Sequence, residues 1–200
     1  MAKELSEYED QQLVDSLVFC PNGLTLSKIA GGAGHTPDFR VYYEAKLVAY
    51  CELKSPRDEW IDQQFEAVQP ASIVGGHRND PTFNRIRRLT RKAADQFRAV
   101  NMDRTVPSAL VFVNHDEAAA FGDMLETFTG LFYASDGSRH VTLPHVASSL
   151  ERDLAHIDIC IWISSKEKRV EGYLFNEGTS PSHVHQLCSL LGLDQSKIRR

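Results

Sequence analysis

Two carboxylates and one amine stand where neighbouring strands could bring them together. Asp38 opens a run, Asp38–Tyr43, whose aromatic and β-branched residues predict a strand. A second apolar run, Leu47–Lys54, ends with Glu52 and Lys54, two residues apart. Residues two apart on a strand share a face, so these two side chains point the same way. If the runs pair as a hairpin, Asp38 lies beside Glu52, and the two carboxylates offer oxygen ligands to a hard cation such as Mg2+.

A simpler interpretation of the same residues is an exposed hairpin with a surface salt bridge, which would add little stability. The neighbouring residues favour the first interpretation. Phe39, Val41, Val48, Cys51 and Leu53 are apolar, so the hairpin is expected to be embedded in a core. Polar groups on a buried hairpin must satisfy one another or bind a metal.

The rest of the chain predicts the elements that position these residues. A helix is expected over Glu4–Phe19 and a short strand over Leu24–Ile29. The apolar stripe of Phe83–Val100 predicts a strong helix, and the apolar run Pro107–Val113 predicts a central strand buried on both faces. A short helix is also expected over Glu59–Val68. Strands interleaved with helices predict an α/β fold, in which a mixed sheet has helices on both faces.

The second half of the chain predicts further elements of the same single domain of 200 residues. We expect a helix over Glu117–Leu131, mostly irregular structure over Tyr133–Ser149 with a turn at Asp136-Gly137, and a hairpin built from Ile157–Ile163 and Val170–Phe175. Ser180-Pro181 predicts the start of a last helix, to about Leu191.

Pro37, Asp38, Glu52 and Lys54, on a hairpin preceded by a helix and followed by a helix and a strand, resemble the motif of the PD-(D/E)xK nuclease superfamily. The resemblance covers about the first 115 residues. It implies a restriction-endonuclease-like core over residues 1–115, elaborated over 116–200 by an added C-terminal hairpin and helix. It also implies a metal-dependent nuclease that hydrolyses phosphodiester bonds, DNA more than RNA, in defence, restriction or repair.

By the same resemblance, Mg2+ would be held by Asp38, Glu52 and the backbone carbonyl of Leu53, and Mn2+ would substitute for it. The ion stabilises charge on the phosphate and lowers the pKa of an attacking water. Lys54 would position that water or neutralise the developing negative charge. Family members often place an acid on the first helix near the metal, which makes Glu9 a candidate ligand. The alternative for Glu9 is a glutamate at the rim of the helix.

Three residues on the helix Phe83–Val100 are candidates for binding the substrate phosphate. Lys92 and Gln96 are four residues apart and share a helical face, and Arg88 lies one further turn back. Gln96 would hold the phosphate or a metal-bound water. The arginine-rich surface of this helix could follow a nucleic-acid backbone. The alternative is an ordinary solvated helix face.

Composition limits the classes of protein that fit. The net charge of −5 argues against a protein whose only task is to coat nucleic acid, because such proteins are usually basic, so any nucleic-acid contact must be local. No apolar run could span a bilayer, and the start of the chain lacks the apolar core of a signal peptide, so we expect a cytoplasmic protein without a membrane contact. Cys20, Cys51, Cys160 and Cys188 have no paired spacing, which argues against a zinc site or disulfides. Cys51 and Cys160 are expected in the core, and the histidines are expected to be structural or exposed.

Two alternatives to an independently active nuclease stay open on the sequence. One is a catalytically silent binding or assembly subunit that keeps the fold. The other is a nuclease subunit active only within a larger complex. A single domain without a DNA-reading module also suggests low specificity, or a homodimer or protein partner that supplies it.

Overall fold

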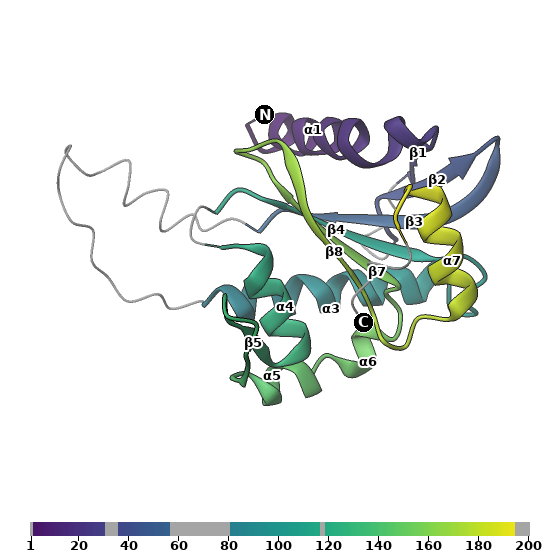
Figure 1. The fold of residues 1–200 in the computed structure, drawn as a ribbon. Helices are drawn as coiled ribbons and strands as arrows, with labels where there is room; N and C mark the ends of the chain where they lie inside the picture. Colours follow the sequence, from purple (N-terminus) through teal and green to yellow (C-terminus); the bar gives the residue numbers. More distant parts are fainter. Residues whose placement is uncertain (1, 31–35, 57–80, 117–118, 195–200) are drawn as a thin grey trace, which may run out of the picture.

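The computed structural model describes residues 2–30, 36–56, 81–116 and 119–194, and within them a mixed six-stranded sheet lies between two layers of helices (Figure 1). The spatial order is β1-β2-β3-β4-β7-β8. Its strands are β1 (Thr25–Lys28), β2 (Phe39–Tyr43), β3 (Lys46–Lys54), β4 (Ser108–Asn114), β7 (Ile159–Ser164) and β8 (Arg169–Phe175). The predicted mixed α/β architecture is confirmed.

Strand direction decides which residues meet at each edge of the sheet. β1, β2 and β3 form an antiparallel meander, β3, β4 and β7 run parallel, and β8 returns antiparallel to β7. β4 is buried along its whole length, as its continuous apolar run predicts. The carboxyl ends of β3, β4 and β7 therefore lie at one edge, and their amino ends lie at the opposite edge.

Helices cover both faces of this sheet. One face packs against α1 (Ala2–Val14) and α7 (Pro181–Leu190), and the other packs against α3 (Thr82–Val100), α4 (Phe121–Thr129) and the short α6 (Glu151–Leu154). Apolar side chains of β4 and β7 alternate between the two layers. Val111 joins the α1 layer and Leu110 the α3 layer, as the two-residue period of a strand requires.

The first helix is rotated relative to the sequence prediction. Its buried line is Asp10, Val14 and Val18, whereas Glu9 is exposed. The sequence predicts an apolar stripe through Leu5, Glu9 and Leu13, which is wrong by one residue, because two neighbouring lines of this helix both carry apolar residues at a spacing of four. α1 continues through a π-helical turn over Asp15–Phe19 and a 3-10 turn over Cys20–Asn22.

The helix from Thr82 to Val100 and the hairpin of β7 and β8 are confirmed. Ser180 caps α7 as predicted, because its hydroxyl accepts a hydrogen bond from His183 N at 3.2 Å. The helix predicted from residue 117 begins later, at Phe121, where Asp123 accepts a bond from the Ala120 backbone N–H.

The expectation of irregular structure over residues 133–149 was wrong in part. A separate two-stranded sheet pairs β5 (Leu131–Tyr133) with β6 (Arg139–Val141), and the short helix α5 (Pro144–Ser148) follows. The turn at Asp136-Gly137 is present, with Gly137 at a φ of 85°. The helix predicted over Glu59–Val68 lies outside the described residues.

The four cysteines are free thiols, and Cys51 and Cys160 lie in the core as predicted. Within the described segments, no helix is long and apolar enough to cross a membrane.

Candidate functional site

The hairpin of β2 and β3 brings the two predicted carboxylates together. Phe39 lies opposite Cys51 in the antiparallel register, which places Asp38 beside Glu52. The Asp38 backbone N–H donates to Glu52 Oε2 at 2.8 Å, and the Leu53 N–H donates to Asp38 Oδ2 at 2.9 Å. Each carboxylate is thus held by a backbone group of the other strand.

Lys54 lies on the same face as Glu52, as the alternation of β3 predicts, and its amine contacts two groups. Lys54 Nζ forms a buried ion pair with Glu52 Oε1 and donates to Gln96 Oε1 at 3.1 Å. Gln96 comes from α3, and its Nε2 donates to the Thr36 backbone carbonyl at 2.8 Å. Gln96 therefore ties Lys54 to the segment that leads into Asp38.

The group is almost closed to solvent. Glu52 is 1% exposed, Gln96 6% and Lys54 8%. Burial raises the pKa of the Glu52 carboxyl from 4.5 to about 7, the positive charge of Lys54 opposes this rise, and the negative charge of Asp38 adds to it. A carboxyl with this pKa exists in both protonation states near neutral pH.

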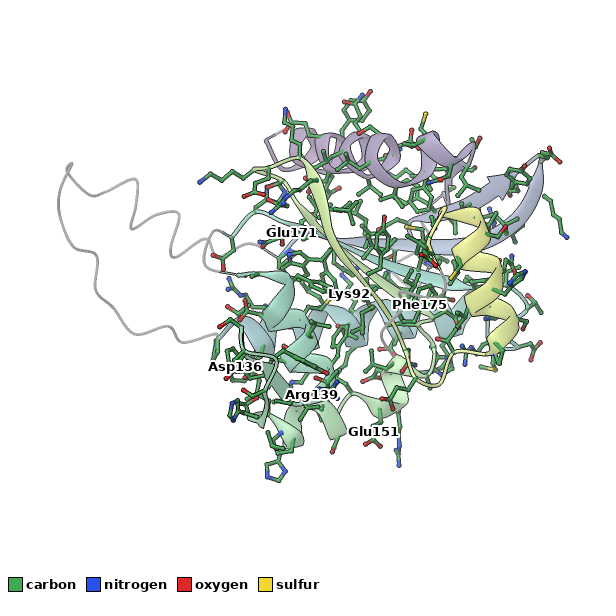
Figure 2. The ribbon with its side chains drawn as sticks, in the orientation of Figure 1. Lys92, Asp136, Arg139, Glu151, Glu171 and Phe175 are labelled. Atoms are coloured by element: carbon green, nitrogen blue, oxygen red, sulfur yellow. The ribbon has the colours of Figure 1, made fainter. Side chains whose placement is uncertain are left out.

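The other predicted site residues do not join this group. Glu9, Arg88 and Lys92 are exposed, so of the helical residues predicted to contact the site only Gln96 reaches it. Gln96 lies on the buried side of α3, where it can meet the end of β3, whereas the positions one and two turns earlier face outward. Figure 2 labels Lys92 on α3.

Several cations of α3 are engaged within the protein. Arg85 pairs with the buried Asp116 at 2.8 Å, and Arg91 lies 3.4 Å from Asp153. Arg98 also contacts Asp153, at 3.8 Å, besides an acid on its own helix. Part of the arginine-rich surface of α3 therefore forms ion pairs within the protein. This reduces the number of α3 cations that could contact nucleic acid.

A neighbouring polar cluster was missed by the sequence reasoning. Asp10 of α1 is 2% exposed, and its carboxylate accepts from Ser55 Oγ at 2.5 Å and contacts His115 Nε2 at 2.8 Å. Ser55 directly follows Lys54, and His115 directly follows β4. Among the described acids of the first helix the buried one is Asp10, whereas Glu9 is exposed, and Asp10 contacts the chain just beyond Lys54. The spacing of four from Asp10 to Val14 and Val18 is the signal that could have identified it.

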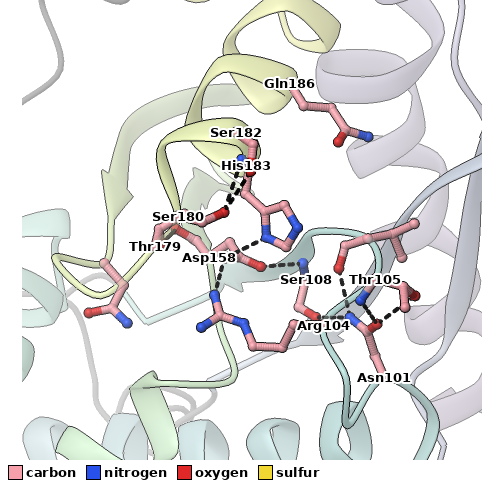
Figure 3. A network of polar contacts seen from close by, with 12 residues as sticks. Asn101, Arg104, Thr105, Ser108, Asp158, Thr179, Ser180, Ser182, His183 and Gln186 are labelled. Carbon is pink, nitrogen blue, oxygen red and sulfur yellow. Dashed lines mark hydrogen bonds and ion pairs between the residues drawn. The ribbon is translucent and has the colours of Figure 1, made fainter.

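Another buried carboxylate lies at the opposite edge of the sheet (Figure 3). Asp158, immediately before β7, is 0% exposed. Its Oδ1 pairs with the Arg104 guanidinium and lies 3.1 Å from His183 Nδ1, while its Oδ2 accepts from the Ser108 N–H at 2.8 Å. This network joins the amino ends of β4 and β7 to α7, and it accounts for His183 as a structural histidine.

The donor chemistry at Asp38 and Glu52 suits a hard cation. Within the described residues, Asp38 Oδ1 accepts no hydrogen bond, so one carboxylate oxygen is available to a ligand. Mg2+ in proteins is commonly held by one or two carboxylates together with waters and substrate phosphates. No group of three or more histidine, cysteine, aspartate or glutamate side chains that could hold a metal ion occurs in the described segments.

Comparison with protein-family models, with curated proteins and with solved structures gave no match. The chemistry of the site therefore rests on Asp38, Glu52, Lys54 and Gln96 themselves. Two adjacent carboxylates with a buried amine can hold a cation on one side and contact an anion through the amine on the other.

Proposed function

We propose that this protein is a metal-dependent nuclease that hydrolyses phosphodiester bonds, acting on DNA in preference to RNA. The observation that supports this most directly is the group of the half-buried Asp38 and the buried Glu52, Lys54 and Gln96, assembled from a hairpin and a helix. A purely structural group would be expected to neutralise its charges, whereas this one keeps two carboxylates adjacent against a single amine.

Asp38 and Glu52, with the Leu53 backbone carbonyl, are the residues that would hold Mg2+ or Mn2+. When bound, such an ion stabilises negative charge on a phosphate and makes a water molecule more acidic. The protein's own contribution is positioning. Gln96 orients the Lys54 amine, and Lys54 supplies positive charge where negative charge develops on the phosphate.

The architecture also supports a restriction-endonuclease-like core. A first helix, an antiparallel meander carrying the acids, the helix α3 and the buried parallel strand β4 follow one another in the order that the sequence resemblance implies. On this proposal, β7, β8 and α7 are the elaboration of that core. A homodimer contact or a protein partner would supply substrate specificity.

The proposal is tested by incubating the purified protein with plasmid, linear and single-stranded DNA, and with RNA, in Mg2+ or Mn2+. We expect cleavage by the parent and a loss of at least about 100-fold in Lys54→Ala, the scale found when one electrostatic donor is removed from an active site. Lys46→Ala is the matched control, because Lys46 is an exposed lysine at the other end of the same strand. Equal cleavage by the Lys54 and Lys46 variants would exclude the mechanism.

A catalytically silent binding or assembly subunit is the second candidate, and one observation favours it. Lys54 already occupies Glu52 Oε1, so the group is partly neutralised without a metal. Titration with Mg2+ separates the candidates, because a ligand at tenfold its Kd stabilises a protein by about 1.4 kcal/mol. A nuclease should show a rise in Tm that Asp38→Ala abolishes, whereas a silent subunit should show none.

A further inference from the structure

The meander of β1, β2 and β3 has two unlike faces. On one face, Leu26, Phe39 and Val41 pack with the apolar core beneath α1 and α7. On the other face, no described side chain of β1 or β2 belongs to the apolar core beneath α3. Figure 1 shows this meander at the side of the sheet away from α4 and α5. The face that β1 and β2 turn toward the α3 layer is therefore left to polar residues.

Three polar side chains form a row across this face. Arg40 of β2 lies opposite Ser27 of β1 on one side and opposite Tyr50 of β3 on the other. Residues directly opposite each other on antiparallel strands project from the same face. Tyr50 packs partly against the core beneath α3, which identifies the face on which the row lies. Ser27 is exposed, and Arg40 and Tyr50 are half-buried, so the row is accessible to solvent.

The row borders the acid pair of the candidate site. Arg40 is two residues from Asp38, and Tyr50 is two residues from Glu52. Residues two apart on a strand share a face and are separated by about 7 Å along it. The row and the acid pair are therefore successive cross-strand positions on one face of the same hairpin.

The side chains of the row have no partner among the described residues. Arg40 forms no hydrogen bond or ion pair there, and neither do the hydroxyls of Ser27 and Tyr50. The amine of Lys54, by contrast, is already engaged by Glu52. Arg40 is thus a cation beside the site that an anion can contact without breaking an ion pair.

The residue types of the row favour a phosphate as that anion. The solvated face of an antiparallel sheet can carry an arginine without any function. Here, however, the guanidinium lies between two hydroxyls and beside the proposed cation site. Arginine, serine and tyrosine side chains are among those that contact the phosphates of nucleic acids, and a guanidinium can donate to two phosphate oxygens at once.

We propose that Arg40, together with the hydroxyls of Ser27 and Tyr50, binds a backbone phosphate of the nucleic-acid substrate next to the phosphate that is cleaved. This inference rests on the proposed function, which it extends by naming a substrate contact on β1, β2 and β3 in place of the predicted one on α3. The contact is independent of base sequence. It also offsets the repulsion that the acid pair exerts on a polyanion.

The test measures binding separately from cleavage. In an Asp38→Ala background with EDTA, fluorescence anisotropy follows a labelled mixed-sequence DNA duplex over a series of salt concentrations. Arg40→Ala should weaken binding by roughly 10-fold or more, because a hydrogen bond to a charged group is lost. It should also reduce the magnitude of the slope of log affinity against log salt by about 0.9. Lys28→Ala is the matched control, because it removes the same charge one residue from Ser27, opposite Phe39 on the other face of the sheet.

Two further variants separate the charge from the hydrogen bonds. Arg40→Lys should keep the salt slope of the parent but bind more weakly, since an ammonium lacks the planar fork of a guanidinium. Tyr50→Phe should weaken binding in the same direction as Arg40→Ala, by less, with an unchanged slope. With Asp38 intact and Mg2+ present, Arg40→Ala should raise KM and leave kcat nearly unchanged, because it removes a contact that is the same in the ground and transition states.

The inference is overturned if the Asp38→Ala protein does not bind DNA, if Arg40→Ala and Lys28→Ala bind alike, or if Arg40→Ala keeps the salt slope of the parent. Should Arg40→Ala not fold, Arg40→Lys decides, because binding as tight as the parent's would exclude the contact. Arg40-dependent binding by a protein that cleaves nothing in Mg2+ would support the inference and refute the nuclease. Cleavage with binding independent of Arg40 would do the reverse, so the two failures are distinguishable.

Discussion

Two buried carboxylates at opposite edges of the same sheet have very different surroundings. Asp158, at the amino ends of the parallel strands, is met by a guanidinium, a backbone N–H and an imidazole. Glu52, near the carboxyl end of β3, is met by a backbone N–H and an amine, but also by a second carboxylate. Their side chains are equally buried, at 1% exposed each.

The difference lies in the balance of charge. Both oxygens of Asp158 have donors, and the donors that hold it come from several elements of the fold. At the other edge, Asp38 keeps an oxygen without a donor in the described residues, and burial raises the pKa of Glu52 to about 7. A carboxylate with complete partners stabilises the fold. Asp38 adds negative charge beside the buried Glu52, so the ionised form of Glu52 is costly unless a cation joins the pair.

The largest effect is expected from removing Asp158. Asp158→Ala should lower the free energy of unfolding by about 3 kcal/mol, because it leaves the Arg104 guanidinium and buried polar groups without their acceptor. Urea denaturation measures this loss. Asp153→Ala is the control, since Asp153 pairs with partly exposed arginines and should cost less than about 1 kcal/mol. Similar losses in the two variants would remove the contrast between the structural network and an ordinary ion pair.

The next effect is the pH dependence that Glu52 gives to stability. Its pKa rises from 4.5 in the unfolded chain to about 7 in the folded protein, so the folded state binds more protons between these values. Stability must therefore fall as pH rises from about 4.5 to 7, by roughly 2–3 kcal/mol from this group.

Glu52→Gln should flatten that part of the stability curve, measured by urea denaturation at a series of pH values. The difference between variant and parent isolates the contribution of Glu52 from those of the other titratable groups. Glu177→Gln, which changes an exposed glutamate, should leave the slope as it is in the parent. If the curves of stability against pH are parallel for the parent and the Glu52 variant, then the partners of Glu52 compensate its charge as fully as those of Asp158 do.

Local periodicity predicted one of these two regions and not the other. Glu52 and Lys54 share a face because strands alternate every residue, and Asp38 reaches them through a short hairpin. The Asp158 network draws on Arg104, Ser108 and His183, which are far apart in sequence, and only the tertiary fold brings them together. No local pattern signals such contacts.

The helices show the same limit of prediction from local sequence patterns. The existence of α1 followed from its apolar spacing, but its rotation did not, because neighbouring lines of the helix were both apolar. A shift of one residue replaced Glu9 by Asp10. Gln96 was predicted on the correct helix from the apolar stripe of that helix, whereas its bond to the Thr36 carbonyl is a long-range contact that the sequence does not encode locally.

The smallest effect concerns Asp10, which shares features with both Asp158 and Glu52. Like Asp158 it is buried, and it contacts the side chains of His115 and of Ser55, the residue that follows Lys54. Ser55→Ala should cost about 1 kcal/mol in the free energy of unfolding, the usual contribution of one hydrogen bond, and Ser55→Thr should restore it.

An activity assay shows whether Asp10 supports the proposed active site, as Glu52 does, or only stabilises the fold, as Asp158 does. If the Ser55 bond fixes the end of β3, cleavage by Ser55→Ala should fall in kcat with little change in KM, because an amine displaced by a fraction of an ångström misplaces charge without removing a substrate contact. The assay is run well below the Tm of the variant, so that the loss of stability does not contribute. An unchanged kcat in a less stable Ser55→Ala protein would group Asp10 with Asp158, as a carboxylate that only stabilises the fold.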